Sequence, residues 1–298
     1  MGDGLFYDKL ITTNGTVVPV KVRSMVGIIP LLAAAVVDEQ SINGALRIGK
    51  QSAWFLERLG LHKLDELAAQ GLFRGRPGQR QLLLGAVGID RLQRLFTKLF
   101  DEGEFLSPYG LRSLSAYHRG HPYQLDVEGI RATVDYEPAE STTPMFGGNS
   151  NRRGPIWFPL NWLVISALER YQQFFGDDLT VEYPTGSGRR LPLDAIAKDL
   201  RERLISIFLV GSDARRPCFG WVERLQRDPA WKDNLMFNEY FHGDNAAGLG
   251  AAHQTGWTGV VADLIRRRHG EVTSAIDVAR SLSEQRAPAS PDRAQLTG

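Results

Sequence analysis

The sequence predicts a mostly α-helical fold, an α/α toroid built of helical hairpins, with small β-hairpins in its loops. Two observations carry this prediction. Several long segments place apolar residues at helical spacing, and the clearest is the series Ile89, Leu92, Leu95, Phe96, Leu99 and Phe100. The β-rich runs come as local pairs around turn residues and not singly between helices, which excludes a parallel α/β sheet.

The first half of the chain alternates hairpin and helix signals. Thr13-Asn14-Gly15 contains the Asn-Gly turn pair, so Phe6–Val22 is expected to form a β-hairpin. The apolar run that follows predicts a helix over Met25–Glu39. Further amphipathic patterns predict one or two helices over Ala53–Gln70 and a helix over Gly88–Asp101.

The second half contains the strongest helix signal of the chain. Pro159–Phe175 has Pro in its first turn, an apolar face, and Gly176 directly after its end. The remaining predicted elements are β-hairpins at Leu125–Tyr136, turning at Glu128-Gly129, and at Leu179–Leu191, and helices at Leu193–Val210 and Thr255–His269.

Composition bounds the organisation and the partners. We expect one domain over residues 1–283 and a disordered tail over 284–298, where Ala, Pro, Ser and charged residues dominate. The formal net charge of +1 gives no electrostatic case for nucleic acid or an acidic membrane. The single cysteine, Cys218, cannot form an internal disulfide, which fits a reducing, cytoplasmic location.

No segment reads as a targeting or membrane signal. Met1–Asp8 is polar and glycine-rich, unlike a signal peptide. The longest apolar run, Val26–Val37, contains Pro30 and falls short of the roughly 20 residues that a bilayer span needs. We therefore expect a buried helix there.

The segment Met236–Trp257 (MFNEYFHGDNAAGLGAAHQTGW) is the most informative part of the chain. It combines carboxylates (Glu239, Asp244) with histidines, aromatic rings and glycines. Flat aromatic faces with polar groups between them suit a ligand with apolar faces and many hydroxyls, such as a sugar. A carboxylate among rings also suits acid–base chemistry. The alternative is a glycine-rich loop that leads into a helix.

The histidines of this segment favour no metal site. His242 and His253 are separated by eleven positions, whereas zinc ligands come at helical spacing or as cysteine pairs. We expect neither a metal nor a cofactor.

Two other loops and an acidic cluster carry candidate binding groups. Phe146–Phe158 offers asparagines, arginines and Trp157, and its alternative reading is a helix-entry loop with a surface arginine pair. Tyr109, in the loop Glu104–Arg112, presents a phenol at a tight turn or serves structure alone. A third group comprises Asp135, Glu137 and Glu140, either as solvated surface or as site lining.

Taken together, these loops resemble a known family. Lys21–Leu31, Glu104–Ser115, Val134–Leu163 and Asn238–Trp257 are similar to the C-terminal catalytic domain of glycoside hydrolase family 63, and the last two segments are the most specific. This family includes processing α-glucosidase I and the bacterial mannosylglycerate and glucosylglycerate hydrolases. The sequence looks most like a bacterial member.

The resemblance implies an (α/α)6 toroid of the six-hairpin glycosidase type and an inverting α-glycosidase that acts on an α-linked glucoside or mannoside. Inverting enzymes use two carboxyl groups about 6.5–9.5 Å apart, one as acid and one as base. Glu239 matches the family's general base. The residues that it implies for sugar binding are Tyr109, Arg112, Arg153, Gly154, Trp157, Asn161, Asp244, His253 and Trp257.

The sequence departs from the family pattern in two places. The family's general acid lies in a loop upstream of the first hairpin and has no counterpart here, and Arg152 stands where relatives usually have Trp. The sequence therefore resembles the C-terminal part of a larger enzyme, with an incomplete toroid that would partner the N-terminal part. The alternatives are a non-catalytic carbohydrate-binding or partner-docking remnant and a purely structural helical protein.

Overall fold

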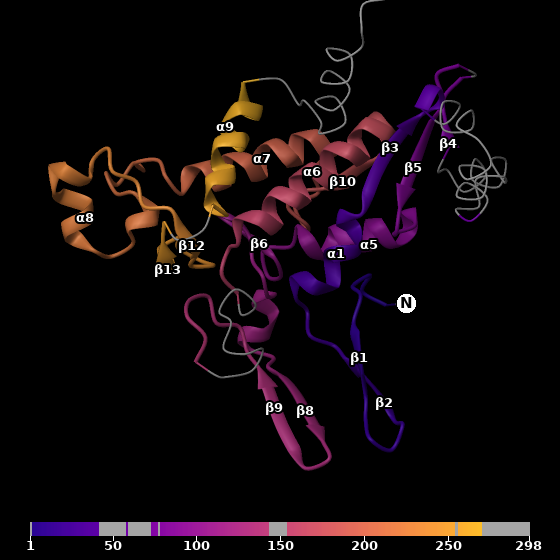
Figure 1. Cartoon of the computed structure of the whole chain (residues 1–298), viewed down its shortest axis with the longest axis horizontal. Coiled ribbons are helices and arrows are strands. Elements are labelled where there is room, and N and C mark those ends of the chain that lie inside the picture. The colour runs from indigo at the N-terminus through magenta and orange to yellow at the C-terminus, as the bar shows by residue number, and fades with distance from the viewer. Residues whose placement is uncertain are drawn as a thin grey trace, which may run out of the picture.

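The computed structural model describes residues 2–41, 58, 73–76, 78–142, 154–253 and 256–269. Helix α6 (Phe158–Phe175) lies at the centre and packs against α7 (Leu193–Ser206), α1 (Ile29–Leu32) and strand β3 (Ala34–Asp38). Figure 1 shows α6 and α7 side by side across the middle of the molecule, with α5 (Ile89–Leu99) below them. The main hydrophobic core includes the buried faces of these helices.

The prediction of a mostly α-helical toroid is wrong. The described residues contain several small antiparallel sheets, and the structure is a mixed α and β fold. The helices of the described regions do not pair into a ring of helical hairpins, because strands occupy part of the surface of α6 and α7: β3 packs on α6, and β7 (Gly110–Leu111) packs on α7. Local strand pairing therefore contributes more to the architecture than the helical periodicities indicated.

The helix predictions after Gly88 differ in accuracy. Helices α5, α6 and α7 lie where the apolar patterns placed them, and α6 begins with Pro159 in its first turn and ends at Gly176, whose φ is 58°. The last helix is shorter than expected, since α9 covers Val261–Arg268 after a 3₁₀ turn at Thr258–Val260.

The prediction of a helix over Met25–Glu39 is wrong over its second half. A 3₁₀ turn (Met25–Ile28) and the short α1 lead into β3, which pairs antiparallel with β5 (Gln81–Gly85), and β4 (Phe73–Arg74) pairs with the other edge of β5. The β-branched Val36 and Val37 suit a strand, and the partner strand lies more than forty positions away. The local apolar run could not reveal that pairing.

All three predicted hairpins are present. They are β1 (Asp8–Ile11) with β2 (Val17–Val20), β8 (Tyr123–Val127) with β9 (Ile130–Val134), and β10 (Thr180–Glu182) with β11 (Arg190–Pro192). Figure 1 shows the first two projecting from the same side of the body. Near their tips, the backbone N–H of Thr13 donates to a Glu128 carboxylate oxygen over 3.1 Å.

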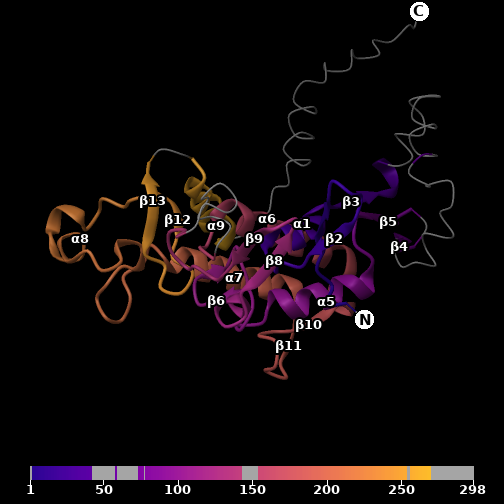
Figure 2. The ribbon, with the colours of Figure 1, turned by 90° about the horizontal axis from the view of Figure 1, so that it is seen from below.

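The most informative sequence segment forms a fourth hairpin. Strand β12 (Asn238–Phe241) pairs with β13 (Gly248–Ala252), and Figure 2 shows both near α8 (Glu223–Arg227), away from β4 and β5 at the other end. This differs from the alternative interpretation of a glycine-rich loop leading into a helix, because the segment is a hairpin and a 3₁₀ turn begins only after Trp257, at Thr258.

Other predictions lie outside the described residues. The helices expected over Ala53–Gln70 fall there almost entirely, as does the tail over 284–298. Among the helices of the described regions, none has the length and apolar character that a membrane crossing requires.

Candidate functional site

Three of the segments singled out in the sequence meet in space. Ile156 forms backbone bridges with Arg112 on one side and with Phe241 on the other. The Ile156 N–H donates to the Phe241 carbonyl over 2.7 Å, and the Phe241 N–H donates back over 3.0 Å. The short strand β6 (Leu106–Ser107) pairs with β7 just before Arg112. The backbone thus places the loop that ends at Arg112, the start of α6 and the β12–β13 hairpin next to one another.

Glu239 lies at an irregularity of this hairpin. The strand register shifts between Asn238 and Tyr240, so Glu239 has no directly opposed partner on β13. Its side chain is half-buried, and among the described residues it forms no hydrogen bond or ion pair. A carboxylate in this state retains its acceptor capacity for a ligand or a water molecule.

Gly250 brings a second carboxylate to the same place. Its φ is +66°, and a Cβ there would lie 2.7 Å from the Tyr240 ring and 3.1 Å from Glu239 Oε2. The Gly250 N–H donates to Glu140 Oε1 over 3.3 Å, and the Tyr240 hydroxyl donates to Glu140 Oε2 over 2.6 Å. Glu140 was one of three acids whose role the sequence left open, and it contacts the hairpin that carries Glu239.

A pair of tryptophans lies beside the hairpin. The Trp157 and Trp257 ring centroids are 5.1 Å apart with a 53° tilt, and the Trp257 side chain is 39% exposed. Thr258, next to Trp257, donates its hydroxyl to the Asn238 carbonyl and so connects this pair to β12. The indole N–H of Trp157 is buried and has no hydrogen-bond partner among the described residues. The pair therefore lies beside β12, and the Trp257 ring is its exposed part.

Arg112 and Asp244 bind each other. The Arg112 Nη2–Asp244 Oδ1 distance is 3.2 Å, and the Arg112 residue is 7% exposed. Asp244 also accepts from the Tyr136 hydroxyl over 2.9 Å and from Arg119 over 2.6 Å. Burial raises the pKa of Tyr136, so this hydroxyl stays protonated and donates. This network holds the backbone around the site, and both predicted binding groups are already engaged within it.

Asn161 and Gly154 have structural roles at the start of α6. Asn161 is 1% exposed, accepts from the Leu111 N–H over 2.7 Å, and donates to the carbonyls of Leu111 and Trp157 over 3.0 Å each. A Cβ at Gly154, where φ is +143°, would lie 2.6 Å from the Tyr136 ring. Asn161 therefore holds the Trp157 backbone, and Gly154 allows the close approach of the Tyr136 ring.

The other candidates are dispersed. Tyr109 is half-buried against the main core. His253 is exposed with φ of 60°, and its ring meets Phe237 edge-on at 5.8 Å. Arg153 lies outside the described residues. Within the described ranges no three His, Cys, Asp or Glu side chains come together as a metal site.

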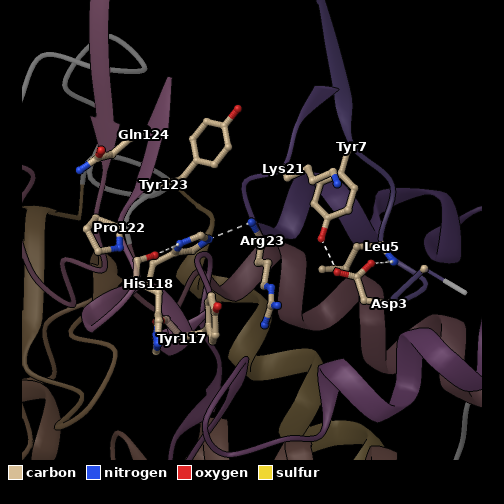
Figure 3. Close-up of a pocket in the computed structure, with 12 residues that line it drawn as sticks. Asp3, Leu5, Tyr7, Lys21, Arg23, Tyr117, His118, Pro122, Tyr123 and Gln124 are labelled. Atoms are coloured by element: carbon tan, nitrogen blue, oxygen red, sulfur yellow. Dashed lines mark hydrogen bonds between the residues drawn. The ribbon is translucent and has the colours of Figure 1, made fainter. Parts of the chain in front are cut away.

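The structure also reveals a hollow that the sequence did not indicate. A cavity of about 650 Å³ lies at the base of the two projecting hairpins (Figure 3), and we call it the N-terminal cavity. None of the predicted site residues lines it. The signal that could have indicated it is the cluster of rings and basic groups in Tyr117–Tyr123 (YHRGHPY), which we did not single out because it lacks the asparagines and tryptophans of the other loops.

Comparison with known proteins gives one relative and no activity. No family model matches the sequence. The chain is 40% identical over 265 residues to an uncharacterized protein of Saccharomyces cerevisiae, YMR196W, and the match covers 87% of this chain and 24% of the yeast protein. The chain thus spans about a quarter of the length of this relative.

Proposed function

We propose that this chain is part of an inverting glycosidase that hydrolyses an α-linked glucoside or mannoside, with Glu239 as the general base. The observation that carries the proposal is the half-buried Glu239 carboxylate, which has no partner among the described residues and lies on the hairpin to which Thr258 connects the paired rings of Trp157 and Trp257. The resemblance to glycoside hydrolase family 63 supports the same assignment for Glu239.

The proposed chemistry uses Glu239 on water. An inverting base removes a proton from the water that attacks the anomeric carbon, on the face opposite the leaving oxygen. Glu239 Oε2 is the acceptor for that proton. The exposed Trp257 ring suits the apolar face of a pyranose.

The acid that protonates the leaving oxygen is not assigned to a residue of this sequence. Both oxygens of Glu140 accept hydrogen bonds, and Asp244 accepts from an arginine pair and a tyrosine. These two carboxylates are therefore engaged as acceptors in the described conformation. Complete hydrolysis requires a proton donor from another part of the protein.

The same observation favours a second candidate, a carbohydrate-binding unit without hydrolytic activity. Such a unit needs the rings and the acceptor but no acid. We expect it to bind short α-glucosides or α-mannosides through Trp257 and Glu239 without turnover.

Glu239→Gln tests the proposal, because the amide keeps the shape of the side chain and cannot take up the proton. In the full natural protein, hydrolysis of α-glucosides and α-mannosides should fall by about 10²–10⁴-fold, the usual contribution of a general base. Glu182→Gln on the distant β10–β11 hairpin is the matched control and should keep full activity.

The outcomes separate the two candidates. Undiminished hydrolysis by the Glu239→Gln protein would rule out the base assignment. Calorimetric binding of the sugars without any turnover in the unaltered protein would favour the binding unit. Neither binding nor turnover would eliminate both.

A further inference from the structure

The N-terminal cavity is separate from the Glu239 site and has walls from three parts of the chain. Its walls come from the segment Gly2–Tyr7, from Lys21 and Arg23 after β2, and from Tyr117–Gln124, which leads into β8. Figure 3 shows Arg23 between Tyr117 and His118 on one side and Tyr7 with Asp3 on the other. Its volume of about 650 Å³ falls within the range of small-molecule sites, roughly 300–1,000 Å³.

One wall is a stack of cation and rings. The Arg23 guanidinium carbon lies 3.8 Å from the Tyr117 ring centroid, and the His121 ring stacks on Tyr117 at 4.3 Å with an interplanar angle of 9°. Both partners cannot occupy one face of the ring at these distances, so Tyr117 lies between them. This arrangement fixes the Arg23 guanidinium and leaves the outer face of the His121 ring toward solvent.

The buried charges behind this wall leave an excess of positive charge. Glu104 is buried, with 5% of its side chain exposed, and it contacts two cations, Arg23 and Lys98. It also accepts from the Ser115 hydroxyl. A single carboxylate neutralises only one of the two cations. Lys21 adds a further positive charge and forms no hydrogen bond or ion pair with any other described residue.

The remaining ionisable groups reduce this excess without removing it. Asp3 accepts from the Tyr7 hydroxyl and, over 3.2 Å, from the Leu5 N–H, and its charge offsets one cation. Arg23, Lys98 and Lys21 therefore keep one net positive charge against Glu104 and Asp3. His118 accepts from the Arg23 N–H at Nε2 over 3.0 Å, and its Nδ1 lies 2.9 Å from the His121 carbonyl. Burial lowers the pKa of His118, so this ring stays neutral near pH 7.

We propose that the N-terminal cavity binds a small anion that carries a phosphate or carboxylate group on a hydroxylated, monosaccharide-sized body. Lys21 and the remaining guanidinium N–H groups of Arg23 provide the donors for the acidic group, because among the described residues only Arg23 Nη1 is bonded, to Glu104. The volume far exceeds that of a bare ion, and Gln124, Asp3 and His121 offer neutral and acceptor groups for hydroxyls. This site goes beyond the proposed glycosidase and does not depend on it.

Calorimetry at low salt with four probes tests the proposal. Glucose 6-phosphate and glucuronate carry the two acidic groups on one body, glucose carries the body alone, and inorganic phosphate carries the anion alone. The first or second probe should bind at least about tenfold more tightly than glucose and phosphate, and the stronger of the two identifies the acidic group. Lys21→Met should weaken that binding roughly tenfold.

Lys9→Met is the matched control, because Lys9 lies on the exposed strand β1 and does not line the cavity. The Lys9→Met protein should bind the anion with the same affinity as the unaltered protein. The proposal is overturned if neither acidic sugar binds, if glucose or phosphate binds equally well, or if Lys21→Met has no effect. Anion binding that disappears in Glu239→Gln and persists in Lys21→Met would also overturn it, by placing the ligand in the other site.

Discussion

Glu239 and Glu104 are both acidic residues near loops of interest, but they differ in how their charges are met. Glu104 is almost fully buried, forms ion pairs with Arg23 and Lys98, and accepts a hydrogen bond from the Ser115 hydroxyl. Glu239 is half-buried at a strand irregularity and has no partner among the described residues. The first carboxylate is committed to holding the structure together, whereas the second keeps its acceptor capacity. The number of intramolecular partners therefore distinguishes a carboxylate that stabilises the fold from one that is available for binding or catalysis.

The same contrast extends to the cations nearby. Arg112 is 7% exposed and tied to Asp244, so it supports the backbone at the Glu239 site. Lys21 lines the N-terminal cavity and has no described partner. Among the described residues, the first site thus offers an unpaired carboxylate (Glu239) and the second an unpaired ammonium group (Lys21). We therefore assign the two sites ligands of different charge.

The largest effect should come from Glu104→Gln, compared with the same change at Glu239. Removing the buried charge leaves Arg23 and Lys98 facing each other, which should lower the free energy of unfolding by about 3–5 kcal/mol. Glu239→Gln should change it by less than about 0.5 kcal/mol. Urea unfolding of both proteins measures the difference. Equal losses would mean that partner number does not distinguish the two acids.

A smaller effect should follow from Gly250→Ala. Alanine at φ of +66° is strained, and its Cβ would crowd the Tyr240 ring at 2.7 Å. We expect a loss of about 2–3 kcal/mol and a displaced Glu239, so any hydrolysis should fall as well. Gly186→Ala is the control, because φ there is +86° but no atom lies within 4 Å of the added Cβ.

Gly186→Ala should cost only the backbone strain, about 1–2 kcal/mol, and should leave activity unchanged. Unfolding free energies of the two variants compare directly because the substitution is identical. A Gly250→Ala protein no less stable than the Gly186→Ala protein would show that the hairpin relaxes around the methyl group. The close contact at Glu239 would then impose no constraint.

The smallest effect is the pH dependence of stability that arises from His118, at the N-terminal cavity. Burial lowers the pKa of His118 below its ordinary value of 6.5, so the unfolded chain takes up a proton before the folded chain does. Stability is therefore complete above about pH 6.5 and falls as the pH drops below it, by at most about 1.4 kcal/mol per pH unit. Burial also lowers the pKa of His242, which contributes in the same direction.

Urea unfolding between pH 7.5 and 5.5 measures this dependence. His118→Gln keeps an acceptor for the Arg23 N–H but cannot be protonated, so its stability should vary less with pH than that of the unaltered protein. An unchanged pH dependence in this variant would assign the effect to His242 or to another group.

Local signals in the sequence were sufficient for local structure. The Asn14-Gly15 turn, the Glu128-Gly129 turn and the helix from Pro159 to Gly176 formed as expected, because their turn residues and caps act within a few positions. The fold class was wrong because it required knowing what covers each helix. Strand β3 pairs with β5 across a long sequence separation, and no periodicity reports such a partner.

The candidate site was predictable in its segments and not in its contacts. The sequence identified Glu239, Trp157 and Trp257 as chemistry-bearing residues, and the structure brings the two tryptophans together beside the hairpin of Glu239. It could not foresee that Asn161 would bond the Leu111 backbone, or that Asp244 would be occupied by Arg112. Side-chain hydrogen bonds depend on which groups become neighbours after folding.

By itself, then, the sequence determined the residue types and the short-range elements, since turns, caps and helical faces depend on neighbouring positions. Only the tertiary structure decided which polar groups are satisfied. In the folded chain, Asp244, Arg112 and Asn161 form hydrogen bonds and ion pairs within the protein. Glu239 and Lys21 have no such partner among the described residues. The physical reason is that a buried polar group must find a partner, and the available partners are set by packing between segments distant in the chain.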